Sequence, residues 1–133
     1  MAHETPGRLR VAELRKLAAE AEGFSANENC VCRMRHAGGW ESISDERWPV
    51  DLMELQGTLR DEELQEPTFE EFHPAGTRYD SPDAPVAVDF FPFNRCNVYR
   101  CVVCKLVVLR YTEYGGYYVD HRARCVKASL IVD

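Results

Sequence analysis

The chain has 133 residues, of which 45% are hydrophobic and 29% charged, and its net charge is −6. This size fits one globular domain of about 100–150 residues, and the net negative charge argues against non-specific binding to nucleic acid. No apolar run approaches the roughly 20 residues that span a bilayer, and residues 1–15 lack the apolar core of a secretory signal, so we expect a cytosolic protein.

The first half of the chain predicts two helices. Thr5 and Pro6 form an N-cap signal, and Gly23 is suited to end a helix, so we expect the first helix over residues 6–22. Its apolar stripe consists of Leu14, Leu17, Ala18 and Ala21. A second helix is expected to begin at Pro49, with an apolar stripe made of Leu52, Leu55 and Leu59.

A β-hairpin is predicted between these helices. Residues 30–35 alternate in polarity, Gly38-Gly39 is typical of a tight turn, and residues 40–48 form the expected return strand. Residues 73–85 are rich in proline and read as a linker or surface loop, and residues 86–93 read as a strand.

The C-terminal part predicts a second hairpin. Residues 105–114 and 117–127 are rich in β-formers, and Gly115-Gly116 is expected to join them as a two-residue turn with positive φ angles. The fold class is therefore α+β, with two helices packed on antiparallel hairpins. We expect a single domain over 1–133, made of an αββα half (1–72), the linker (73–85) and a β-rich half with a cysteine knuckle (86–133).

The hairpin turn also sets an expected register. If Tyr114 pairs with Tyr117, Cys125 lies opposite Leu106 and on the same face as Cys104. The core face would then hold Leu106, Val108, Val119 and Ala123. The wetter face would hold Lys105, Glu113, Asp120, Arg122 and Arg124, together with Val107, Leu109 and Val126.

Six cysteines in a cytosolic chain favour metal binding over disulfides. Cys101 and Cys104 form a Cys-x-x-Cys knuckle, which is the usual half of a structural zinc site. With the register above, the preferred zinc ligands are Cys96, Cys101, Cys104 and Cys125. The alternatives replace one or two of these by Cys30, Cys32 or His121, or treat the cysteines as small buried apolar residues without a metal.

Charge is unevenly distributed along the chain. Residues 41–71 hold eleven acidic and two basic residues, a net charge of −9, whereas residues 95–127 hold seven basic and two acidic residues, a net charge of +5. The acidic segment suggests a surface for a basic partner protein, with electrostatic steering of association. Its candidate binding residues are Glu54, Asp61, Glu62, Glu63 and Glu66.

No catalytic motif is recognised, so we expect a binding protein rather than an enzyme. A second hypothesis is a zinc-knuckle adaptor that binds nucleic acid through the basic hairpin, whose tyrosines offer stacking surfaces. A third is a small hydrolase, because Arg110, Thr112, Tyr114 and His121 share one face of that hairpin.

The run from Leu109 to Tyr118, together with Cys96-x4-Cys101-x2-Cys104, resembles a stretch found in small proteobacterial proteins of unknown function. As a small, acidic chain without a catalytic motif, it also resembles the immunity proteins of contact-dependent growth inhibition systems. That resemblance implies a bacterial antitoxin that neutralises a toxin domain by occluding it, and it transfers no functional residues.

Overall fold

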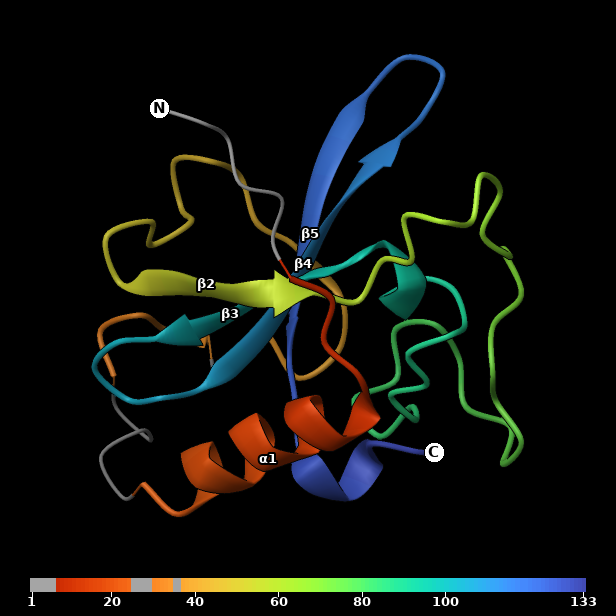
Figure 1. Ribbon diagram of the computed structural model, residues 1–133. Helices are drawn as coiled ribbons and strands as arrows, with labels where there is room; N and C mark the ends of the chain where they lie inside the picture. Colours follow the sequence, from red (N-terminus) through yellow and green to blue (C-terminus); the bar gives the residue numbers. More distant parts are fainter. Residues whose placement is uncertain (1–6, 25–29, 35–36) are drawn as a thin grey trace.

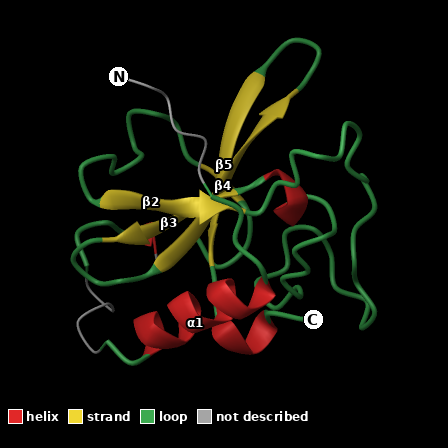
Figure 2. Cartoon of the chain, viewed as in Figure 1, coloured by secondary structure: helices red, strands yellow, loops and turns green. Residues whose placement is uncertain are grey.

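The protein folds as one helix on a five-stranded antiparallel sheet, seen in a computed structural model that describes residues 7–24, 30–34 and 37–133 (Figures 1 and 2). The sheet order is β1-β5-β4-β3-β2. The elements are α1 (Val11–Glu22), β1 (Glu41–Ser42), β2 (Met53–Thr58), the 3-10 turn η3 (Phe93–Arg95), β3 (Asn97–Cys101), β4 (Val107–Tyr114), β5 (Val119–Cys125) and the 3-10 turn η4 (Ala128–Leu130). The α+β class is confirmed.

Two apolar cores cover the two faces of the sheet. On one face, α1 and η4 lie side by side, and Leu14 of α1 belongs to the same buried cluster as Val107 and Leu109 (Figure 1). On the other face, Val108 and Ala123 pack with the cysteines and with the loop around Trp48. Since side chains alternate along β4, the unbroken run of buried residues 106–109 supplies both cores.

The first predicted helix is found, but it is shorter than expected. It begins at Val11, and the predicted N-cap at Thr5-Pro6 lies outside the described residues. Gly23 follows its last turn as expected, and its N–H donates to the carbonyl of Ala19 over 3.2 Å.

The second predicted helix is wrong, since its segment contains β2 instead. Met53 and Leu55 pair with β3, and a bulge between Leu55 and Gly57 bends the strand. The spacing of leucines that predicted a helix is therefore overridden by pairing with β3, which follows almost forty residues later in the sequence.

The first predicted hairpin is also absent from the described residues. Residues 30–34 form turns, and neither Gly38 nor Gly39 has a positive φ angle. The expected return strand shrinks to β1, which pairs with β5 rather than with residues 30–34; Arg35 lies outside the described residues. The expected strand over 86–93 is reduced to a bridge between Val86 and Ile131.

The C-terminal hairpin exists, but its register differs by two residues from the predicted one. Tyr114 pairs with Val119 and not with Tyr117, so the loop has the four residues 115–118, and Cys125 lies opposite Val108. Neither glycine of the loop has a positive φ angle. A shift of two preserves which face each side chain takes. The assignment of a wet face is still wrong, because Val107, Leu109 and Arg124 are buried, while Val119 is 60% exposed.

A long segment without strands connects β2 to η3. Pairs of aromatic rings hold it against the body, with Phe69 on Phe91 and Phe72 on Phe90 at centroid distances of 5.5 and 5.1 Å. The predicted linker over 73–85 is part of this segment and contains neither helix nor strand. Among the described helices, none is long and apolar enough to cross a membrane.

Candidate metal centre

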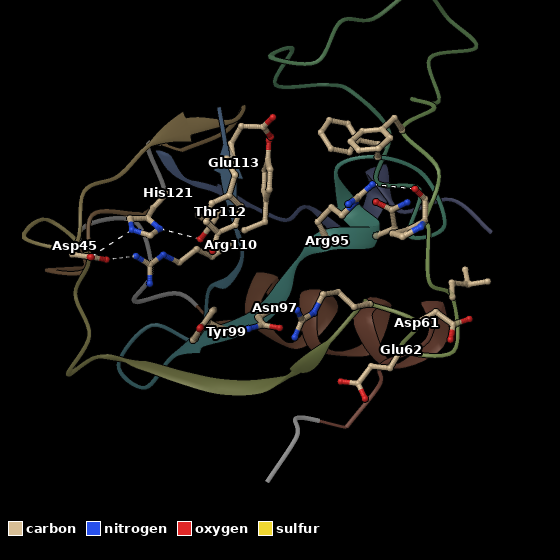
Figure 3. Close-up of a pocket in the computed structure, with 18 residues that line it drawn as sticks. Asp45, Asp61, Glu62, Arg95, Asn97, Tyr99, Arg110, Thr112, Glu113 and His121 are labelled. Carbon is tan, nitrogen blue, oxygen red and sulfur yellow. Dashed lines mark hydrogen bonds and ion pairs between the residues drawn. The ribbon is translucent and has the colours of Figure 1, made fainter. Parts of the chain in front are cut away.

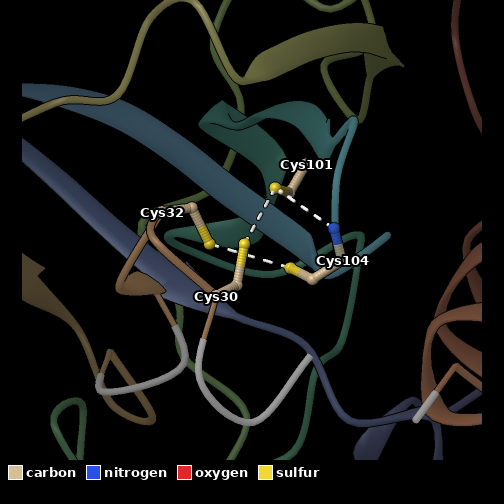
Figure 4. Close-up of side chains that lie close together, drawn as sticks. All are labelled: Cys30, Cys32, Cys101 and Cys104. Carbon is tan, nitrogen blue, oxygen red and sulfur yellow. Dashed lines mark hydrogen bonds between the residues drawn. The ribbon is translucent and has the colours of Figure 1, made fainter. Parts of the chain in front are cut away.

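Four cysteines from two distant parts of the chain meet on the face of the sheet opposite α1 (Figure 4). Cys101 ends β3 and Cys104 lies in the turn before β4, while Cys30 and Cys32 come from the turns that follow α1 in the sequence. The four sulfur atoms all lie within 4.8 Å of one another. This group can bind a metal ion.

The sulfur distances fit a tetrahedral site. The Sγ atoms of Cys30 and Cys101 are 3.6 Å apart, and those of Cys32 and Cys104 are 3.7 Å apart. Zinc binds thiolate sulfur at about 2.3 Å in tetrahedral geometry, which separates the sulfur atoms by about 3.8 Å. Cys30, Cys32, Cys101 and Cys104 are thiols, so the close pairs are not disulfides.

Each cysteine pair lies in a turn that ends in the left-handed region. Arg33, directly after Cys32, has φ 59°, and Lys105, directly after Cys104, has φ 68°. The carbonyl of Cys30 accepts from the N–H of Arg33 at 3.1 Å, and that of Cys101 accepts from the N–H of Lys105 at 2.9 Å. The backbone N–H of Cys104 also donates to the Cys101 sulfur at 3.5 Å. These turns point both cysteine pairs toward one position.

The surroundings of the group are apolar. Cys101 and Cys104 are fully buried, Cys32 is 3% exposed, and Cys30 is half-buried. The second core adds aliphatic and aromatic side chains around them: Met34, Ile43, Trp48, Met53, Leu106 and Val108. Few water molecules can reach such a site, which is typical of structural metal centres.

The thiols differ in their ease of ionisation. Burial raises the pKa of Cys32 and raises that of Cys104 to about 11. At Cys30 burial also acts to raise the pKa, but hydrogen bonds from the Cys32 backbone and from neighbouring thiols outweigh it and lower the pKa. A bound cation would stabilise all four thiolates, because it supplies the opposite charge that this apolar environment lacks.

The structure places the predicted ligands Cys96 and Cys125 outside this group. Cys96 belongs to the core that contains α1, its sulfur donates to the carbonyl of Pro92 at 3.3 Å, and burial raises its pKa. Cys125 lies in the same core as the four cysteines but is not part of the four-sulfur group. Cys101 and Cys104 are thus joined by the alternative pair, Cys30 and Cys32. The Cys-x-Cys spacing of Cys30 and Cys32 was the feature of the sequence that could have identified them as ligands.

His121, the other alternative ligand, lies in a different place. Its Nδ1 is 3.0 Å from the hydroxyl of Thr112, which lies directly opposite it, and its Nε2 is 3.5 Å from the carboxylate of Asp45. The same carboxylate accepts a hydrogen bond from Arg110 at 2.8 Å. These side chains belong to the wall of a cleft of about 670 Å³ (Figure 3).

The cleft lies between the β4–β5 hairpin and the loop after β2. Its hairpin wall includes Thr112, Glu113 and Tyr114, and its loop wall includes Asp61 and Glu62 (Figure 3). Two of the five predicted partner-binding acids therefore line this cleft.

The five acids differ in their partners. Glu54 lies 3.8 Å from Arg100, and Asp61 lies 3.4 Å from Arg8. The other three, Glu62, Glu63 and Glu66, are exposed and form no ion pair with a described residue.

Comparison of the chain with protein-family models, with curated proteins and with solved structures found no match. The chemistry of the site is therefore inferred from its geometry.

Proposed function

We propose that this chain is a non-enzymatic binding protein whose fold is closed by one structural zinc ion, and that it binds a basic partner protein through an acidic surface. The most concrete form of this proposal is a cytosolic immunity protein that occludes a toxin domain. The observation that carries the metal part of this proposal is the group of four sulfur atoms from Cys30, Cys32, Cys101 and Cys104.

The donor set supports a structural rather than a catalytic metal. Catalytic zinc keeps one coordination position open for water or substrate, whereas four thiolates fill all four positions. The group also joins residues 30–34, which contain no strand, to the end of β3. A metal at this point would hold the chain that follows α1 against the sheet.

The acidic loop and the hairpin tip support a protein partner. Glu62, Glu63 and Glu66 have no cation among the described residues, so they are available to a basic surface. Tyr114 and Tyr117 are 77% and 105% exposed on the projecting hairpin (Figure 1), and tyrosine is enriched at the centres of protein interfaces.

The same surface offers little to nucleic acid. Arg110 pairs with Asp45, Arg122 pairs with Asp120 at 2.8 Å, and Arg124 is 1% exposed. These three arginines of the hairpin are therefore already paired or buried, and they are not available to a phosphate backbone. This favours a protein partner.

The metal part of the proposal is tested by unfolding with and without a chelator. Structural zinc contributes roughly 10 kcal/mol or more to folding in small domains. We expect a strong chelator to lower the thermal midpoint sharply and added zinc to restore it. An identical midpoint under both conditions would contradict a structural metal.

The partner is tested by capture from the native host, followed by charge reversal. Changing Glu62, Glu63 and Glu66 to lysine should weaken the complex and flatten its salt dependence. The matched control reverses Glu41, Glu46 and Asp51, which are also exposed acids and give the same change in net charge. Equal effects of the two triple variants would refute binding through the loop.

A further inference from the structure

Two of the three arginines that line the cleft form no ion pair with a described residue. Arg110 pairs with a carboxylate in the same cleft. Outside it, carboxylates pair with Arg8, Arg15, Arg100 and Arg122. Arg60 and Arg95 line the cleft, and neither forms an ion pair with a described residue. Their guanidinium groups line a cavity that also holds the carboxylates of Glu62 and Glu113, which form no ion pair with a described residue.

Arg95 is held in place with donors to spare. Its Nη2 donates to the carbonyl of Pro67 at 3.0 Å, and its guanidinium stacks over the ring of Phe69 at 4.3 Å. Its Nε is buried without an acceptor. A ligand in the cleft would therefore accept from the terminal N–H groups of Arg95, and a carboxylate or phosphate oxygen is the acceptor that suits a guanidinium best.

Arg60 presents a second guanidinium to the same cleft. Its Nε donates to the hydroxyl of Thr58 at 3.4 Å, which leaves both terminal nitrogens without a protein acceptor among the described residues. The adjacent carboxylate of Asp61 forms an ion pair with Arg8 instead. Both arginines of the cleft wall therefore have terminal N–H groups available for a ligand.

Aromatic side chains line the cleft beside these arginines. Phe69 is 73% exposed on the loop wall, and Tyr114 is 77% exposed on the hairpin wall. Exposed rings of this kind stack on aromatic and heterocyclic ligands. The volume of about 670 Å³ lies within the range of about 300–1,000 Å³ that is usual for small-molecule sites.

We propose that this cleft binds a small aromatic or heterocyclic compound that carries one phosphate or carboxylate group. Arg60 and Arg95 would hold the anionic group, and the exposed rings would contact the planar part. The net charge of −6 and the carboxylates of Glu62 and Glu113 in the cleft wall disfavour a polyanion, so the ligand is a single small molecule rather than a nucleic acid strand.

The probes are phenyl phosphate and adenosine monophosphate, titrated into the zinc-loaded protein by calorimetry and by NMR. We expect each to bind at least about tenfold more tightly than phenol, adenosine or inorganic phosphate alone, because both parts of the ligand contribute. Binding of neither probe, or equal binding of adenosine, would overturn the proposal. Tighter binding of a uridine decamer than of the monophosphate would overturn the single-molecule ligand.

Variants locate the binding site. Arg60→Gln changes an exposed side chain and should weaken phenyl phosphate by about tenfold or more, as should Arg95→Lys, which keeps the charge but loses the planar fork. Arg47→Gln, an exposed arginine outside the cleft, should leave affinity unchanged. Thermal midpoints confirm that each variant is folded. Equal affinities across the three variants would place the anion elsewhere. The zinc experiment changes residues outside the cleft, whereas the acidic-loop variant changes Glu62, which lines it, so probe binding is measured with Glu62 in place.

Discussion

Arg33 and Lys105 adopt a backbone conformation that residues other than glycine rarely take. Each directly follows the second cysteine of a pair, with φ angles of 59° and 68°. This conformation costs about 1 kcal/mol or more for a residue with a Cβ atom. Both turns nevertheless keep it, which is consistent with a packing arrangement that requires the four sulfur atoms to converge.

Replacing Lys105 by glycine should raise stability, since glycine adopts positive φ without strain. We expect the free energy of unfolding to rise by up to about 1 kcal/mol in denaturant titrations. Lys127→Gly is the matched control. Its φ of −103° needs no glycine, so stability should fall by about 0.5–1 kcal/mol. A loss of stability in both variants would show that the turn at Lys105 is not strained.

The contribution of Asp120 to stability depends on pH. Hydrogen bonds from Arg122 at 2.8 Å and from Ser42 at 2.7 Å lower the pKa of Asp120. Because the folded pKa lies below the ordinary value of about 3.9, this stabilisation is complete above that pH and is lost as the pH falls through the folded pKa.

Asp120→Asn should therefore cost about 1 kcal/mol at pH 7, and the difference from wild type should shrink below about pH 4. Urea unfolding at pH 7 and pH 3 measures both values. Asp133→Asn removes a carboxylate that is 87% exposed, and it should change stability little at either pH. A constant difference between wild type and Asp120→Asn across the pH range would contradict the account.

At the scale of elements, the sequence pattern correctly predicted the elements that are formed by residues close together in the chain. The apolar stripe of α1 and the pair of strands around Gly115-Gly116 follow from residues close in sequence, and both exist. The side-chain faces of Cys104 and Cys125 survived the change in register because the shift was even. The β2–β3 pairing depends on residues far apart, so the local leucine spacing misidentified β2 as a helix.

Gly57 shows how tightly the edge strand β2 is covered. Residues 7–9 run along it, with the N–H of Leu9 donating to the carbonyl of Thr58 at 2.8 Å. A Cβ atom on Gly57 would lie 2.6 Å from the carbonyl oxygen of Gly7 and 2.7 Å from Cγ of Leu9. The segment before α1 therefore depends on a residue without a side chain at this position.

Gly57→Ala should lower the free energy of unfolding by about 1–3 kcal/mol, because backbone must shift to admit the methyl group. Gly116→Ala is the control, since nothing lies within 4 Å of a Cβ at that position. It should change stability by less than about 0.5 kcal/mol. Denaturant titration compares the two, and equal losses would rule out the tight contact at β2.

At the scale of the whole molecule, the four cysteines bring together parts of the chain that are 71 and 72 residues apart. The sequence identified the Cys-x-x-Cys half of the site, because its ligands are neighbours. It did not identify the other half, since choosing among Cys30, Cys32, Cys96 and Cys125 requires knowing which segments pack on the sheet. The expected hairpin over 30–48 was wrong, so the positions that it implied for Cys30 and Cys32 were wrong as well.

We propose that these four cysteines, and neither of the other two, bind one zinc ion. Native mass spectrometry of protein purified without added metal should find close to one zinc per chain. Among the six single Cys→Ser variants, those at Cys30, Cys32, Cys101 and Cys104 should lose the zinc or hold it much more weakly, while those at Cys96 and Cys125 should keep it. Wild-type protein without metal, or zinc that is lost from Cys96→Ser or Cys125→Ser and kept in Cys30→Ser, would contradict the account.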